Sequence, residues 1–161
     1  MSSKHMRNKT FQSQFQGPES SPGFLLWKAS NFHQRLQREA LRELDLTPTQ
    51  FSILACYFFL AAETDVAVSQ SDVGRHAALD KMLVSAGTRA LEQKKFIKRL
   101  PSKTDGRAFS IRVTPRGAAT CNQALRITEN LDAEFFDGLD NVGNFTRMLT
   151  TLLGPSNGCA Q

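Results

Sequence analysis

The chain has 161 residues, of which 40% are hydrophobic and 22% charged, a composition typical of one water-soluble globular domain. It has no apolar run long enough to cross a bilayer and no basic-then-apolar signal pattern, so we expect a cytoplasmic protein rather than a membrane or secreted one. Cys56, Cys121 and Cys159 stand at unrelated spacings, which excludes a disulfide framework and any CxxC metal or redox motif.

The positive charge of the chain is local. Residues 69–116 contain 11 Lys and Arg against 4 Asp and Glu, a net +7, whereas the remaining residues sum to −2 and the whole chain to +5. A cationic segment beside an acidic C-terminal third is typical of a protein that binds a polyanion, and nucleic acid is the obvious candidate.

The two ends of the chain lack a periodic pattern. Residues 1–20 are rich in Ser, Gln, Lys and Asn, so we expect a flexible N-terminal tail there, and residues 155–161 form a second short tail. Ser21-Pro22 then places an N-cap before a proline at the first helical position, and apolar residues recur at helical spacing as far as Leu44. This pattern predicts a long amphipathic helix over about residues 22–44.

Three further helix starts carry capping signals. Thr47-Pro48-Thr49-Gln50 is a capping box that opens an almost wholly apolar helix to about Leu60, which belongs in the core. Ser69-Gln70-Ser71-Asp72 repeats the box and predicts a short third helix that ends near His76. Asp80 is the predicted N-cap of a fourth helix, which extends to about residue 94.

After Lys95 the pattern changes from helical to extended. Residues 96–100 and 108–113 are predicted strands around a turn at 101–107. In the second strand apolar and polar residues alternate, which predicts a β-hairpin with one buried face.

The C-terminal third is helical again. Thr114-Pro115 caps a fifth helix through about Leu139, and Asp140 begins a last one whose apolar stripe stops at Gly154-Pro155. The predicted fold is mainly α, with four helices, two strands and two further helices in chain order.

Two short helices followed by a two-stranded hairpin make a winged helix-turn-helix. In this motif the second helix enters the DNA major groove, and the hairpin tip reaches the flanking backbone or the minor groove. The corresponding parts here are residues 69–76, 80–94 and 101–107.

The predicted recognition helix has one inward and one outward side. We place Leu83, Val84, Gly87 and Leu91 on the inward side. The outward side offers donors and apolar surface to base edges and phosphates, and Gln70 and Ser71 offer donors to phosphate from the helix before it. The outward residues are Lys81, Met82, Ser85, Thr88 and Arg89.

The hairpin tip supplies the remaining predicted DNA contacts. Arg107 is expected to enter the minor groove, with Asp105 bracing its guanidinium, and Lys103 to contact a phosphate. The alternative for this tip is a solvated turn with a local ion pair.

Several of these residues fall into motifs, and the chain resembles the MarR-type transcriptional regulators from about Ser21 to Leu153. The resemblance rests on a Leu-Thr-x-x-Gln-Phe helix opening, a Leu-Glu-x-Lys helix end, and a wing with Asp-x-Arg followed by Thr-Pro-Arg-Gly. Those motifs are Leu46 to Phe51, Leu91 to Lys94, Arg99 with Pro101-Ser102, Asp105-Gly106-Arg107, and Thr114-Pro115-Arg116-Gly117.

The resemblance implies one domain over residues 21–154, with a DNA-binding lobe at about 47–114 and dimerisation helices at about 22–44 and 115–153. It also implies an obligate homodimer on a pseudo-palindromic operator in double-stranded DNA, and a repressor rather than an activator. The residues support the dimer independently, because both chain ends carry more apolar surface than one small lobe can hide. These apolar residues are Phe24, Leu25, Trp27, Phe135, Phe136, Leu139, Phe145 and Leu152.

A small lipophilic effector is a further implication of the resemblance. Trp27, His33, Tyr57 and Phe58 are candidates to line its pocket, and core or dimer packing is the alternative for each. A regulator that needs no effector is a further alternative. The chain departs from the family in having Lys95 where a glycine usually ends the recognition helix, which predicts a strained connection to the hairpin.

Other function classes have little in their favour. The sequence has no Gly-rich phosphate loop, nucleophile elbow or HExxH motif, so we expect neither an enzyme nor a cofactor. The histidines lack metal-ligand spacing, and Cys56 lies in an apolar helix where burial raises the pKa of a thiol, against a redox sensor. The remaining alternative is a winged-helix interaction module whose basic face docks an acidic protein.

Overall fold

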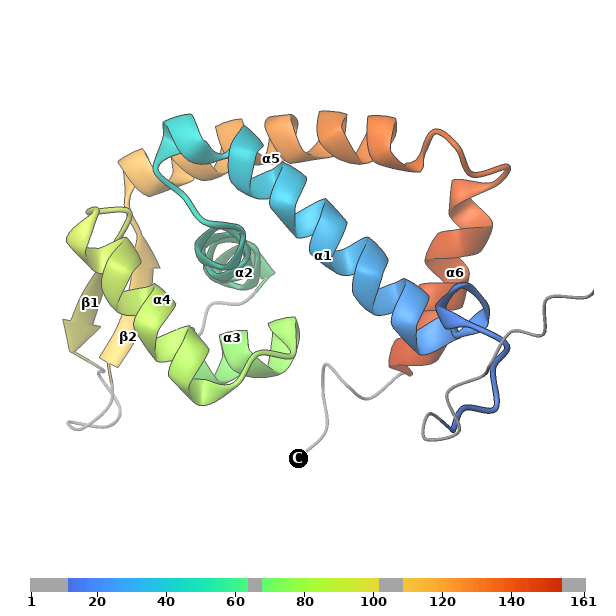
Figure 1. Cartoon of the computed structure of the whole chain (residues 1–161). Helices are drawn as coiled ribbons and strands as arrows, with labels where there is room; N and C mark the ends of the chain where they lie inside the picture. Colours follow the sequence, from blue (N-terminus) through green and yellow to red (C-terminus); the bar gives the residue numbers. More distant parts are fainter. Residues whose placement is uncertain (1–11, 64–67, 102–108, 155–161) are drawn as a thin grey trace, which may run out of the picture. The chain divides into compact units, whose positions relative to one another are not determined.

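The computed structural model describes residues 12–63, 68–101 and 109–154 (Figure 1). In chain order the elements are η1 (Pro18–Ser20), α1 (Pro22–Ala40), η2 (Arg42–Leu44), α2 (Pro48–Glu63), α3 (Gln70–Ala77), α4 (Lys81–Gln93), β1 (Ile97–Pro101), β2 (Phe109–Val113), α5 (Pro115–Phe136) and α6 (Val142–Leu153). The predicted order of helices and strands is confirmed. Two short 3-10 helices, η1 and η2, are additional.

The chain divides into two compact units, and the boundary falls inside α1 between Arg35 and Leu36. Within the first unit, α1 begins at Pro22 as predicted, and the Ser21 hydroxyl accepts a bond from the Phe24 amide at 3.4 Å. The rings of Phe24 and Trp27 lie 5.8 Å apart on its exposed surface. The predicted single domain over residues 21–154 stays a prediction.

The predicted end of the first helix at residue 44 was wrong by one turn. In the second unit, α1 stops at Ala40, Leu41 is fully buried, and η2 follows. Asp45 closes this turn in the left-handed conformation, with φ of 53°. Burial of Leu41 in the core stabilises the chain more than continuation of the regular helix would.

The capping signals are confirmed. The Gln50 amide donates to the Thr47 hydroxyl at 3.2 Å, and the Thr47 amide donates to the Gln50 side chain at 3.3 Å. The second box has the same reciprocal bonds between Ser69 and Asp72, and the Leu83 amide donates to Asp80 at 2.9 Å. Each cap satisfies an amide that a helix N-terminus leaves without an intrahelical partner.

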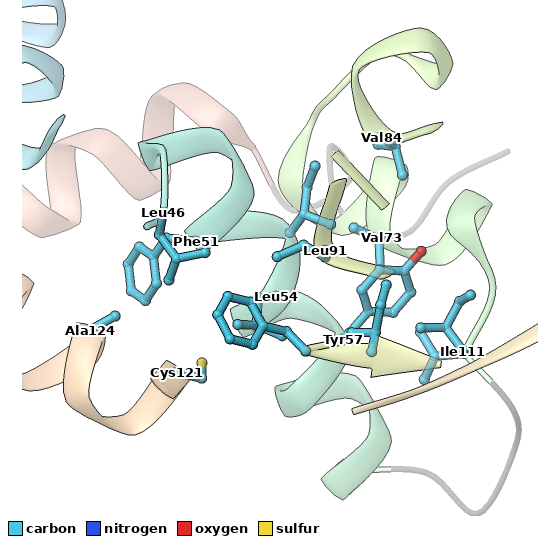
Figure 2. Close-up of a cluster of buried hydrophobic side chains, with 14 of the residues drawn as sticks. Leu46, Phe51, Leu54, Tyr57, Val73, Val84, Leu91, Ile111, Cys121 and Ala124 are labelled. Atoms are coloured by element: carbon cyan, nitrogen blue, oxygen red, sulfur yellow. The ribbon is translucent and has the colours of Figure 1, made fainter. Parts of the chain in front are cut away.

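Helix α2 forms the centre of the second unit. It contacts α3, α4, α5 and β2, and Ile53, Leu54 and Tyr57 are buried on it. Figure 2 shows Leu54 and Tyr57 among side chains from α3, α4, β2 and α5. This arrangement explains why α2 is apolar almost all round, as a helix surrounded by neighbours requires.

The hairpin pairs β1 with β2 in antiparallel register, with Ile97 opposite Val113 and Lys98 opposite Arg112. Ile97 and Ile111 are buried, whereas Lys98 and Arg112 are exposed, so the predicted single buried face is confirmed at the base of the hairpin. Val68 adds an antiparallel bridge to Ile111. The predicted turn at the tip lies outside the described residues.

The last two helices begin as capped elements. The Gly117 amide donates to the Thr114 hydroxyl at 3.0 Å at the start of α5, and the Asn144 amide donates to Asn141 at 2.7 Å at the start of α6. Helix α6 therefore begins at Val142 after an N-cap at Asn141, two residues later than the predicted start at Asp140, and α5 ends at Phe136 rather than at about Leu139. Across the described ranges, no helix combines the length and apolarity that a membrane span requires.

Candidate nucleic-acid interface

Helices α3 and α4 enclose a hollow of about 290 Å³ on the surface of the second unit. The connection between them is tight, since Ala78 takes the left-handed conformation with φ of 51° and the Leu79 amide donates to the Gly74 carbonyl at 2.9 Å. The residues that line the hollow are Gln70, Ser71, Gly74, Arg75, Leu79, Lys81 and Val84. Three predicted contact residues from two different helices therefore meet at one place.

Arg75 is a basic member of this hollow that the sequence analysis missed. It lies in the last turn of α3 and forms an exposed ion pair with Asp72 at 3.6 Å. Its place in the basic segment was visible in the sequence, but its position at the same hollow as Lys81 depends on how the two helices pack.

The outward side of α4 carries most of the predicted residues. Lys81, Met82 and Arg89 are exposed, Met82 at 83%, and Ser85 is half-buried. This side combines two cations, a hydroxyl and a thioether, which suit phosphates, base edges and thymine methyl groups respectively.

Thr88 was wrongly placed on the outward side. It is 0% exposed, and its hydroxyl lies 3.0 Å from the buried Tyr57 hydroxyl. Position 88 follows Val84 by four residues, which returns a helix almost to the same face, whereas Leu83 is about 100° away from Val84. Leu83, predicted to face inward, is accordingly 48% exposed.

The four candidates for an effector pocket are not brought together within either unit. Tyr57 is 1% exposed and packs in the core, where burial raises its pKa while the bond to Thr88 opposes that shift. Tyr57 therefore has the core packing that was the alternative for it. Trp27 and His33 belong to the first unit, and Phe58 lines a separate groove in the second.

The residues of the wing tip, Lys103, Asp105 and Arg107, lie outside the described residues. The base of the wing is fixed to the end of α4. Arg99 of β1 forms an ion pair with Glu92 at 2.9 Å, although the guanidinium Nε is not aligned as a hydrogen-bond donor.

The motif residues bind one another at two further places. Lys94 donates to Gln50 at 3.0 Å and to the Asp45 carbonyl, and it pairs with the Asp45 carboxylate at 3.2 Å. The Thr114 hydroxyl donates to the Lys95 carbonyl at 2.8 Å. The motifs thus join the end of α4 to the starts of α2 and α5, and they hold the recognition helix in place.

Lys95 has the strained conformation that the missing glycine predicts, with φ of 62°. The Phe96 amide donates to the Leu91 carbonyl at 3.0 Å and the Lys95 amide to the Glu92 carbonyl at 2.9 Å. These two bonds define a Schellman motif, which normally places glycine at this position.

The two cysteine thiols in the described part of the second unit, Cys56 and Cys121, are not activated. Burial raises the pKa of Cys56, and burial together with the nearby Cys56 raises the pKa of Cys121 to about 11. A thiol with a raised pKa is a poor nucleophile and a poor redox sensor. Among the described residues, no three His, Cys, Asp or Glu side chains are grouped as metal ligands would be.

Comparisons with known proteins agree on one family. The family model "MarR family" matches residues 46–109. The HTH-type transcriptional regulator YdcH of Bacillus subtilis is 36% identical over 89% of this chain and 97% of its own length. A crystal structure of a MarR-family transcriptional regulator from Rhodococcus sp. RHA1 superimposes with a TM-score of 0.75, 24% identity, and coverage of 88% of this chain and 100% of that one. A mutant Escherichia coli MarR complexed with operator DNA has a TM-score of 0.72, 24% identity, and coverage of 82% and 93%.

Proposed function

We propose, from the premise that this chain belongs to the MarR family of transcriptional regulators, that it binds a pseudo-palindromic operator as a homodimer and represses transcription in the cytoplasm. The observation that carries the proposal is the hollow between α3 and α4, where Gln70, Ser71, Arg75 and Lys81 gather beside the exposed side of the recognition helix. A basic surface on the exposed side of one helix fits the charge and the width of the DNA major groove.

The proposed contacts divide by role. Gln70, Ser71 and Arg75 are placed to contact phosphates, which set the position of the protein without reading sequence. Lys81, Met82, Ser85 and Arg89 are the proposed contacts with base edges. Thr88 takes no part, because its side chain is buried.

The wing completes the proposed interface on the strength of its sequence. Arg107 enters the minor groove, Asp105 orients it, and Lys103 contacts a phosphate. The Arg99–Glu92 ion pair supports this role, since it ties the base of the hairpin to the recognition helix.

Unburied apolar surface supports the homodimer. In α6 the side chains of Met148, Leu152 and Leu153 are exposed, and no residue of this helix is buried. Trp27 and its apolar neighbours are exposed in the first unit. Exposed apolar side chains of this kind mark protein–protein contacts, and a second copy of the chain is the proposed partner.

A DNA titration tests the proposal. Fluorescence anisotropy on operator fragments, selected from genomic DNA by the purified protein, should give an affinity that falls steeply with salt, because binding releases counterions from the phosphates. Arg107→Ala should weaken binding by about 10- to 100-fold without changing the dimer or the melting temperature. Lys28→Ala, on the exposed surface of α1, is the matched control for loss of one charge.

Two results would overturn the proposal. Equal affinity for all fragments in low salt would favour the interaction module, whose partner is an acidic protein. An unchanged affinity of Arg107→Ala would remove the wing from the interface.

We also propose that a small lipophilic ligand releases the operator. This part rests on the family to which the chain belongs and on the groove that contains Phe58. A screen for compounds that raise the melting temperature separates it from a regulator that needs no effector.

A further inference from the structure

Three apolar residues are exposed within the first two turns of the recognition helix α4. Met82 is 83% exposed, Leu83 is 48% exposed, and Ala86 is exposed as well. Ala86 follows Leu83 by three residues and Met82 by four, the spacing of neighbours on a helix surface. The three residues therefore form one continuous surface, which we call the apolar edge of α4.

The apolar edge occupies one flank of the exposed side of α4, and polar residues occupy the other. A helix turns by about 100° per residue, so Lys81 and Leu83 lie to either side of Met82. Lys81 lines the hollow between α3 and α4 together with Arg75. Ser85 lies on the same flank of Met82 as Lys81. The recognition helix thus presents charge and a hydroxyl on one flank and apolar surface on the other.

The DNA major groove contains one apolar feature that matches this edge, the C5-methyl group of thymine. The other base groups in the groove donate or accept hydrogen bonds, and an apolar side chain against them leaves them without a partner. Because Lys81 and Arg89 on the same exposed side attract the anionic duplex, the apolar edge comes to lie against base edges. Met82 and Leu83 then favour thymine over cytosine.

We propose that the apolar edge reads thymine methyl groups, and that Leu83 is a specificity-determining residue of this regulator. The polar flank contacts phosphates and hydrogen-bonding base edges, whereas Leu83 selects a pyrimidine that carries a 5-methyl group. This inference rests on the proposed function, because it requires α4 to enter the major groove.

A scan of the operator with uracil tests the proposal, because uracil differs from thymine only in lacking the methyl group. Each thymine of a fragment selected by the wild-type protein is replaced in turn, and the affinity is measured by fluorescence anisotropy. At one position or more in each half-site, uracil should weaken wild-type binding about 3- to 5-fold, the loss expected for one buried methyl group.

Substitutions on the two flanks of α4 identify the residue that contacts this methyl group. Leu83→Ala should bind the thymine and uracil forms of the sensitive position equally, because the partner of the methyl group is absent. Leu83→Met keeps an apolar side chain of similar reach and should keep the loss. Ser85→Ala is the matched control on the polar flank, and uracil should still weaken its binding about 3- to 5-fold. Sensitivity that survives in Leu83→Ala and disappears in Met82→Ala would overturn the role of Leu83.

Cytosine at the sensitive position gives a second measurement with a different hydrogen-bonding pattern. Replacing the thymine–adenine pair by cytosine–guanine should weaken wild-type binding. 5-Methylcytosine should then recover about 3- to 5-fold in the wild-type protein and nothing in Leu83→Ala. An absence of recovery in the wild-type protein would overturn the methyl contact.

The failures of the two proposals can be told apart. Equal wild-type affinity for all fragments, before any uracil is introduced, would overturn the proposed function and this inference with it. Selective binding without a uracil-sensitive position would overturn this inference alone. Leu83→Ala should leave the dimer and the melting temperature unchanged, since alanine favours a helix and Leu83 is half exposed. Loss of the dimer with unchanged DNA affinity would instead assign the apolar edge to a contact between two copies of the chain.

Discussion

Helices α4 and α6 are of nearly equal length, 13 and 12 residues, and both have an apolar and a polar side. The apolar side is buried in α4 and exposed in α6. In α4 the apolar side is buried through Val84, Gly87 and Leu91. In α6 no residue is buried, and Leu152 is 73% exposed. The second unit therefore completes the packing of the recognition helix, whereas the terminal helix of the same unit leaves its apolar side exposed.

This difference assigns the two helices to two levels of assembly. The bonds around α4, from Lys94 to Gln50 and from Tyr57 to Thr88, are all made within one lobe. The lobe should hold the recognition helix whether or not a second chain is present. Changes at α4 should act on stability, and changes at α6 on association.

The largest effect is expected from a change that breaks the lobe. A Cβ atom at Gly117 would lie 2.0 Å from the Phe96 carbonyl oxygen. Because that oxygen belongs to the backbone, the clash can be relieved only if the backbone itself moves. Gly117→Ala should therefore cost about 3 kcal/mol or more of unfolding free energy. Chemical denaturation measures it. Gly138→Ala is the control, since nothing lies within 4 Å of its Cβ position, and it should change stability by less than about 1 kcal/mol.

A change at α6 should instead separate the chains. Leu152→Glu places a charge on the most exposed leucine of α6 and should weaken the dimer by about 2–3 kcal/mol, roughly 100-fold, since a desolvated charge opposes association. Sedimentation at several protein concentrations measures it. The control Thr150→Glu puts the same charge on a polar position of the same helix. Equal dimer affinity for both variants would contradict the assignment of the leucine face.

The buried hydroxyl pair tests how α4 is held by α2. Thr88→Val leaves the Tyr57 hydroxyl buried without its partner and should cost about 1–3 kcal/mol. Combining it with Tyr57→Phe removes both polar groups and should recover most of that loss. The three variants form a double-mutant cycle measured by denaturation. Additive losses would show that the two hydroxyls do not interact.

Much of the architecture was accessible from the sequence because local signals and tertiary packing agree. The capping boxes at Thr47 and Ser69 predicted helix starts that the structure confirms. Each box is a self-contained set of side-chain and backbone bonds, so its geometry requires no knowledge of distant residues.

The errors came from features that distant contacts decide. Thr88 appears suited to the surface because it is polar, and only the position of Tyr57, 31 residues earlier, makes burial favourable. The groove that contains Phe58 was missed because its lining comes from α2, both strands and α5. Sequence spacing does not indicate that Lys98 and Arg112 meet until the strand register is known.

The smallest expected effect is at the end of α4, where a substitution should increase stability instead of lowering it. Lys95 is held at φ of 62°, a conformation that costs a residue with a side chain about 1 kcal/mol and costs glycine much less. Lys95→Gly should therefore raise the free energy of unfolding by about 0.5–1 kcal/mol, measured by thermal and chemical denaturation. Lys95→Ala removes the same charge but keeps the backbone cost, so it should give no such gain.

The neighbouring lysine supplies a second control. Lys94→Gly should be destabilising, because Lys94 has φ of −76° and its side chain bonds Gln50. If glycine raises the free energy of unfolding at position 95 and lowers it at position 94, backbone conformation rather than charge limits the stability of this helix end.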